Sequence, residues 1–236
     1  INILYLQSTA MTELTLLGTM TVGAYYLLRW FKTENSLYLV YSAFFIMLAT
    51  LVRYDAWFML FFAASIITLY TFKKYGYHRA EGTFIFFCTL AGFGVVLWLL
   101  WNLLIFKDAL YFAFGPYSAH AQQDQLNAAG VLPSKGNWLF SLKVYMYAMA
   151  YNTGAFTLFL GFVAAIFLWL DKKVSVPARI ASSALIAPLL FNVLALYLGH
   201  SVLYIQGISG DTWFNVRYGI MMLPSIAIFV GYLVGR

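Results

Sequence analysis

Charged residues are scarce in this sequence, and their scarcity decides the class of protein. Only 9% of the 236 residues are Asp, Glu, Lys or Arg, whereas an ordinary soluble domain carries about 25%. Hydrophobic residues make up 63%. A chain with this balance cannot cover a water-exposed surface, so the sequence predicts an integral membrane protein built from transmembrane helices.

Cysteine is almost absent as well. The single Cys88 lies in an apolar run, which excludes a disulfide framework and a cysteine metal cluster. A phosphate-binding Walker loop, a glycine-rich dinucleotide loop and a serine nucleophile elbow are also missing. We therefore expect no cofactor, with a divalent metal left open. The net charge of +6 does not indicate nucleic acid, because the basic residues stand in short clusters between apolar runs.

Long apolar runs dominate what is present. A spanning helix needs about 20 mostly apolar residues, and seven stretches qualify as candidates. They follow one another with short breaks, so we expect an all-α bundle forming a single transmembrane domain over residues 1–236. The sequence starts without Met, and we expect it to be part of a longer chain. The seven stretches are residues 12–31, 37–52, 57–72, 83–106, 143–170, 180–199 and 217–235.

The basic residues divide unevenly between alternate breaks. One set holds Arg29, Lys32, Lys73, Lys74, Arg79, Lys172, Lys173, Arg179 and Arg236. The other set holds Arg53, Lys107, Lys135, Lys143 and Arg217. Because cytoplasmic loops carry the excess of Lys and Arg, the larger set is expected inside. The N-terminus would then lie outside and the C-terminus inside.

A polar stretch at residues 53–57 interrupts two apolar runs. A charge at bilayer depth costs about 2.5–3.5 kcal/mol on insertion scales, so Arg53 and Asp55 lie at a membrane surface or serve a function. Residues two apart do not share a helix face, so we expect each to turn to another helix or a ligand rather than form an in-helix ion pair. Asp55 is either an interfacial acid beside Trp57 or part of a site.

Two further charged residues share the expected outer side. Glu13 follows Thr12 at the start of the first candidate helix; Thr12 could cap that helix with Glu13 complementing its dipole, or Glu13 could be a carboxylate at a site entrance. Arg217 is either a membrane-edge anchor or, with Arg53, a ligand for an anion, because the guanidinium fork suits phosphate.

The longest break, residues 107–142, forms an expected outer loop. Its aromatic residues, Tyr111, Phe112, Phe114 and Tyr117, suit a segment lying along the membrane interface rather than a disordered one. His120 lies in the same loop. No His-x-x-x-His spacing accompanies it, so metal binding there is not expected.

Four stretches together resemble membrane glycosyltransferases of the GT-C fold, the relatives of protein O-mannosyltransferases and of the aminoarabinose transferase of lipid A. Residues 7–13 resemble their outward segment that ends in an acid. Residues 53–57 resemble an Arg-Tyr-acid-Gly-Trp stretch, residues 110–119 an outer loop, and residues 215–218 with Leu223 and Pro224 a late Arg-Tyr helix. The matches run in the expected order over nearly the whole chain, on one expected face.

The resemblance implies an inverting glycosyltransferase, moving a hexosyl or pentosyl group from a polyprenyl-phosphate donor to a lipid, glycan or protein acceptor. It implies a prokaryotic inner (plasma) membrane protein of the cell envelope, active on the outer face among membrane lipids. Glu13 and Asp55 would be catalytic. Arg53, Tyr54, Arg217, Tyr218, Tyr117 and His120 would bind substrate. The family also carries an important acidic residue in its first outer loop, near the N-terminus. That residue is missing here, because the sequence starts at Ile1.

Two other classes stay open. A transporter or flippase would place ionisable residues and broken helices near the membrane midplane, whereas the charges here cluster at expected outer ends. A seven-helix receptor would match the helix number and the outer N-terminus. Two measurements separate the glycosyltransferase from the transporter or flippase: transfer of labelled sugar from a polyprenyl-phosphate donor, and movement of lipid between leaflets.

Overall fold

A computed structural model describes residues 11–116, 118–128 and 130–236. The described residues form helices and no β-strand, which confirms the expected all-α class. The helices are α2 (Glu13–Thr33), α3 (Ser36–Val52), α4 (Asp55–Tyr75), α5 (Tyr77–Phe106), α6 (Tyr111–Phe114), α7 (Ala119–Ala128), α8 (Trp138–Thr153), α9 (Ala155–Leu170), α10 (Val176–Ser182), η1 (Ser183–Ile186), α11 (Ala187–Tyr197), η2 (Val216–Met222) and α12 (Leu223–Val234).

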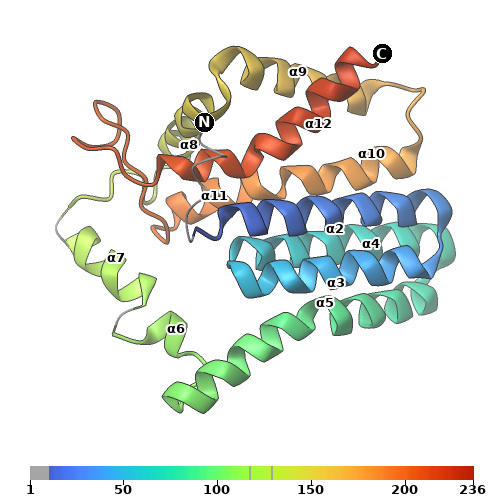
Figure 1. Ribbon diagram of the computed structural model, residues 1–236, viewed down its shortest axis with the longest axis horizontal. Helices are drawn as coiled ribbons and strands as arrows, with labels where there is room; N and C mark the ends of the chain where they lie inside the picture. The colour runs from blue at the N-terminus through green and yellow to red at the C-terminus, as the bar shows by residue number, and fades with distance from the viewer. Residues whose placement is uncertain (1–10, 117, 129) are drawn as a thin grey trace. The chain divides into compact units, whose positions relative to one another are not determined.

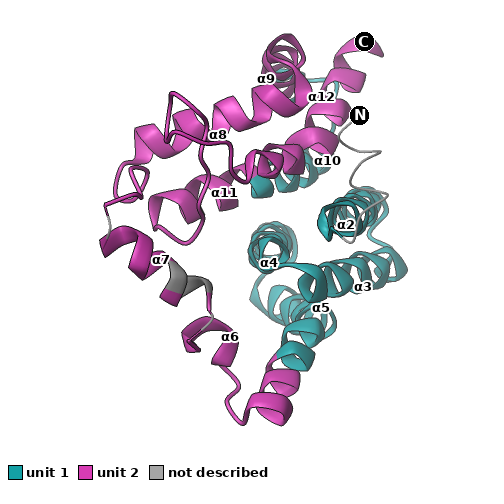
Figure 2. Ribbon diagram, turned by 60° about the vertical axis from the view of Figure 1, so that its left-hand side comes forward, with its two compact units in different colours: residues 1–98, 168–188 teal, residues 99–167, 189–236 magenta. Residues whose placement is uncertain are grey.

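The chain divides into two compact units, each discontinuous in sequence (Figure 2). Unit 1 comprises residues 1–98 and 168–188, and unit 2 comprises residues 99–167 and 189–236. The chain passes between the units inside α5, inside α9 and near the start of α11. The units are therefore defined by which residues pack together and not by where helices begin and end, because three helices belong partly to each unit.

Unit 1 is built on α2, α3 and α4, which lie side by side (Figure 1). The turn from α2 to α3 is short because Glu34 adopts left-handed backbone (φ 56°) and the Asn35 side chain accepts the N–H of Leu37. Where α2 and α3 pack, the buried Ser42 hydroxyl donates to the carbonyl of Gly23 at 2.9 Å. A Cβ at Gly23 would meet Ile46, so glycine allows the two helices to approach closely.

Unit 2 is built around α8, with η2, α11 and α12 contributing to its core. Tyr145 and Met149 of α8 are fully buried together with Leu196 of α11. A Cβ at Gly219 of η2 would overlap the backbone of Ala148, so only glycine fits there. This close approach fixes η2, and with it the segment that carries Arg217, against α8.

Within the described residues, four helical segments are long and apolar enough to cross a membrane: α4, α5, Val176–Tyr197 and Val216–Val234. The helix α3 is apolar but has only 17 residues. Large apolar side chains of α5, such as Trp101 and Leu104, are more than half exposed. Exposed apolar surface of this kind suits contact with lipid, which agrees with the expected integral membrane protein.

One expected span is wrong as a single helix. The run over residues 143–170 is broken into α8 and α9, which are bent by 111°. The break falls at Gly154, whose φ of +82° ends α8 in a conformation that other residues rarely adopt. If the bent pair is counted as one span, the candidates number five.

The expected loop 107–142 is also shorter and partly helical, since it contains α6 and α7 and ends where α8 begins.

Candidate functional site

Three charged side chains meet where α2 begins, α3 ends and α4 begins, all within unit 1. Arg53 Nε donates to Asp55 Oδ2 at 2.8 Å, and Arg53 Nη1 lies 3.5 Å from Glu13 Oε1. The side chains of Glu13 and Asp55 are only 1% and 6% exposed, whereas that of Arg53 is 22% exposed. We call Glu13, Arg53 and Asp55 the buried triad. Arg53 thus turns to an acid of another helix, which agrees with the expectation that it would contact another helix or a ligand.

The backbone at Arg53 explains this geometry. The helix α3 ends at Val52, and Arg53 is extended (φ −157°, ψ 155°) before α4 begins at Asp55. Its N–H still donates to the carbonyl of Ala49, and its carbonyl accepts the N–H of Ala56. The expectation that Asp55 would turn to another helix or a ligand is therefore wrong, because it pairs with Arg53. The helix spacing rule does not apply, because Arg53 lies outside both helices.

The capping explanation for Glu13 is also wrong in part. Thr12 has helical backbone and makes no side-chain hydrogen bond that caps α2. Glu13 stands in the first turn, where the helix dipole favours an acid, but its side chain is buried and directed to Arg53. A carboxylate kept this far from water needs a partner, and the guanidinium supplies one.

Neighbouring contacts hold the end of α3 beside the start of α4. Trp57 Nε1 donates to the carbonyl of Thr50 at 3.0 Å, and the Thr50 hydroxyl donates to the carbonyl of Met47 at 2.6 Å. A Cβ at Gly94 of α5 would collide with the Thr50 hydroxyl and the Met47 carbonyl. Thr50 and Gly94 were not expected to matter. The only signal in the sequence was a glycine within an apolar run.

The electrostatics of the triad are unbalanced. Two carboxylates face one guanidinium, so the formal charge of the three is −1. Asp55 binds the Nε edge of Arg53, which restricts how the rest of the guanidinium is directed. The partial exposure of Arg53 gives an anion access to this cation. The arrangement therefore combines a held guanidinium with two carboxylates able to accept protons or hydroxyl hydrogen bonds.

Tyr54 lies next to the triad and is exposed at 45%. Its ring meets the ring of Trp57 edge-on, with centroids 5.3 Å apart. Trp57 is held by its own hydrogen bond, so the Tyr54 ring leans on a fixed aromatic neighbour. An exposed aromatic ring beside a cation suits packing on a sugar or a lipid chain.

Arg217 and Tyr218 belong to unit 2 rather than to the unit of the triad. They lie in η2, where the Arg217 guanidinium carbon is 5.8 Å from the centre of the Tyr218 ring. Tyr145 donates to the carbonyl of Tyr218 at 3.2 Å, and Asn152 Nδ2 donates to that of Val216 at 2.7 Å. These bonds from α8 hold both sides of Arg217. The expected pairing of Arg53 with Arg217 on one phosphate stays a prediction.

The remaining expected site residues are not described by the structure. Tyr117 lies outside the described residues, and the same is true of the side chain of His120 in α7. Among the side chains that are described, no group of three or more His, Cys, Asp or Glu residues could hold a metal ion.

A second charged cluster joins the opposite ends of α2 and α4. Glu34 Oε1 accepts hydrogen bonds from Tyr70 at 2.9 Å and from Lys74 at 2.5 Å, and Glu34 Oε2 accepts one from Tyr75. We call these four residues the exposed cluster, since the Glu34 and Lys74 side chains are 33% and 47% exposed. The bond from Lys74, followed by that from Tyr75, lowers the pKa of Glu34 to about 2.

Comparison with known proteins adds no relative: no protein-family model, no curated protein and no solved structure matches this chain.

Proposed function

We propose that the protein is a membrane glycosyltransferase that moves a sugar from a polyprenyl-phosphate donor to an acceptor hydroxyl. The buried triad carries the proposal, because it holds one guanidinium between two carboxylates at one end of a helix bundle. Such a transfer needs a cation for the leaving phosphate and a carboxylate for the acceptor proton. The resemblance of residues 53–57 and 215–218 to GT-C enzymes points to the same chemistry.

In this proposal Arg53 binds the donor phosphate and Asp55 holds its guanidinium in place. The acceptor oxygen attacks the anomeric carbon, the bond from that carbon to the phosphate oxygen breaks, and polyprenyl phosphate leaves. The acceptor proton passes to a carboxylate, for which Glu13 and Asp55 are the candidates. Tyr54 packs on sugar or lipid, and Arg217 with Tyr218 supplies a second contact to the donor.

The proposed topology places the triad on the outer face. In it the chain crosses the membrane seven times, with the N-terminus outside and the C-terminus inside a prokaryotic plasma membrane. Support comes from the distribution of basic residues and from unit 1 itself. There the triad lies at one end of α2 and α4, and the exposed cluster with Lys74 lies at the other.

Transfer of labelled sugar from a polyprenyl-phosphate donor, measured with the full-length protein in proteoliposomes, tests the proposal. Arg53→Lys should lose most activity, because an ammonium cannot bind Asp55 and a phosphate through one planar fork. Asp55→Asn and Glu13→Gln should lose activity at nearly unchanged side-chain volume. Glu34→Gln is the matched control, since it removes a carboxylate at the opposite end of the same helices.

Two results would contradict the proposal. One is wild-type transfer by all three triad variants, each with a normal elution profile. The other is absence of transfer by the wild-type protein from any polyprenyl-phosphate sugar, with hexosyl and pentosyl donors both tried.

A transporter or flippase is the second candidate function, and the bent pair α8–α9 favours it. Helices broken near a glycine are a common feature of transporter binding sites, and the break at Gly154 bends this pair by 111°. Lipid movement between leaflets by the wild-type protein, without sugar transfer, would support this second candidate over the first.

A further inference from the structure

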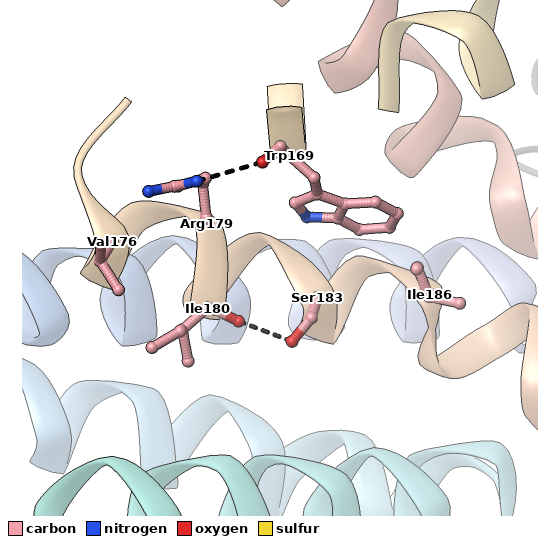
Figure 3. A pocket seen from close by; sticks show the side chains of 6 residues that line it. All are labelled: Trp169, Val176, Arg179, Ile180, Ser183 and Ile186. Carbon is pink, nitrogen blue, oxygen red and sulfur yellow. Dashed lines mark hydrogen bonds between the residues drawn. The ribbon is translucent and has the colours of Figure 1, made fainter. Parts of the chain in front are cut away.

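A groove in unit 1 combines apolar walls with one arginine (Figure 3). Its volume is about 590 Å³, within the range of about 300–1,000 Å³ common for small-molecule sites. The lining belongs to the end of α9, to α10 and to η1. The residues that line it are Trp169, Val176, Arg179, Ile180, Ser183 and Ile186.

Arg179 is held in place while keeping donors for a ligand. Its Nη1 donates to the carbonyl of Trp169 at 3.2 Å, and the rest of the guanidinium points away from that carbonyl (Figure 3). Among the described side chains, no carboxylate lies within 4.0 Å of this guanidinium. The cation therefore has no anionic partner in the described part of the chain.

The indole beside Arg179 is fixed as well. Trp169 Nε1 donates to the Ser182 hydroxyl at 2.8 Å, and that hydroxyl donates to the carbonyl of Arg179. The ring thus forms a firm apolar wall of the groove (Figure 3). Ile180 and Ile186 also line the groove and add apolar surface to it.

The surroundings of the groove are basic. The turn after α9 carries Lys172 and Lys173, both exposed, and its one acid, Asp171, accepts the backbone N–H of Lys173. The helix α10 packs against α2, and it begins toward the end where α2 finishes with Lys32 (Figure 1). A phosphate would therefore meet a favourable field at this end of unit 1.

We propose that this groove binds an anionic membrane lipid, with the lipid phosphate on Arg179 and an acyl chain along Trp169, Ile180 and Ile186. Arginine matches phosphate through its planar fork. The apolar walls favour a lipid over a soluble phosphate. The segment Val176–Tyr197 is also a candidate span, so the groove opens beside a helix that lipid chains would surround. This binding is separate from the proposed sugar transfer.

Native mass spectrometry of the purified chain, with defined lipids added, tests the inference. The chain should retain dioleoylphosphatidylglycerol in preference to dioleoylphosphatidylcholine. Arg179→Gln should weaken retention of phosphatidylglycerol roughly ten- to hundredfold, the worth of one or two lost charge-assisted hydrogen bonds, and Arg179→Lys should restore part of it. Arg79→Gln is the matched control, because Arg79 is an exposed arginine of the same unit that lies over the Tyr75 ring and outside the groove.

A second variant tests the apolar part. Ser183→Phe should fill the groove and reduce retention of dioleoylphosphatidylglycerol more than that of its dihexanoyl analogue. Equal losses in the Arg179→Gln and Arg79→Gln variants would overturn the inference in favour of unspecific attraction to surface charge. Displacement of the lipid by millimolar inorganic phosphate would overturn the role of the acyl chain and leave a phosphate site alone.

Discussion

Charged side chains join α2 to α4 at both ends of the two helices, but the two contacts differ in their exposure to water. At one end the partly exposed Arg53 pairs with the buried carboxylates of Glu13 and Asp55. At the other end Glu34 and Lys74 pair where water reaches both. Each cluster ties the helices together through an acid at an end of α2, Glu13 in its first turn and Glu34 directly after its last residue. The exposed cluster pairs one carboxylate with one ammonium and adds two tyrosine hydroxyls, whereas the buried triad comprises two carboxylates and one guanidinium.

That difference separates a structural contact from a candidate site. Exposed ion pairs cost little to form and contribute about 0–1 kcal/mol. Buried charges cost several kcal/mol each to desolvate and often stabilise less than apolar residues of the same size. An exposed ion pair such as Glu34–Lys74 would be enough to join α2 to α4 without the desolvation of buried charges. Stability alone therefore does not explain why the triad is buried, whereas the proposed binding of a ligand would.

Removal of each cation should give the largest contrast. Arg53→Ala leaves two carboxylates buried side by side and should destabilise the protein by about 3–5 kcal/mol, with Arg53's partial exposure favouring the lower value. Lys74→Ala exposes Glu34 to water and should cost about 1 kcal/mol or less. Thermal unfolding of both variants in the same detergent measures the contrast.

A triple variant shows whether the stability lost in Arg53→Ala comes from the negative charges of Glu13 and Asp55. Adding Glu13→Gln and Asp55→Asn to Arg53→Ala removes both carboxylate charges that faced the guanidinium and should recover much of the lost stability. If Arg53→Ala and Lys74→Ala lower the unfolding temperature equally, the two clusters do not differ as described.

A smaller effect is expected from the glycine behind the triad. Gly94→Ala puts a methyl group into the Thr50 hydroxyl and the Met47 carbonyl at the end of α3, and overpacking of this kind costs about 1–3 kcal/mol. Gly92→Ala, two residues away on α5, meets no atom within 4 Å and should be neutral or slightly stabilising.

The proposed transfer activity sharpens this test. Gly94→Ala should lower activity as well as stability, because the end of α3 positions Arg53, whereas Gly92→Ala should leave activity unchanged and stability no lower. Equal behaviour of the two variants would mean that α5 does not constrain the triad.

The parts of the fold that the sequence predicts are those set by polar residues in apolar runs. Arg53 marks the end of α3 because a charge there cannot remain in a continuous apolar helix. The meeting of Glu13 with Arg53 follows from antiparallel α2 and α3, which return the chain to its starting side. Both features depend on patterns within a single segment or its neighbour.

The features that escaped prediction depend on backbone detail or on distant residues. The Arg53–Asp55 bond exists because Arg53 is extended, which spacing alone does not show. Gly154 lies inside the stretch 143–170 that the sequence predicts as one span, and nothing in its apolar neighbours marks the break. Nothing in the sequence places Tyr70 and Tyr75 beside Glu34, and only the fold brings their hydroxyls to it.

The smallest expected effect is the pH dependence of the exposed cluster. The pKa of Glu34 is lowered to about 2, chiefly by the hydrogen bond from Lys74, against an unfolded value of about 4.5. Because the folded pKa is the lower one, the contribution is present in full above pH 4.5 and is lost as pH falls toward 2. Solvent screening at this exposed pair limits the contribution of Glu34 to about 1 kcal/mol or less.

Urea unfolding in detergent at pH 7 and pH 3 tests this pH dependence. Wild type should be more stable than Glu34→Gln at pH 7, and the gap in the free energy of unfolding should narrow at pH 3. A gap that stays constant or widens toward pH 3 would show that the charge of Glu34 does not stabilise this end of the helices.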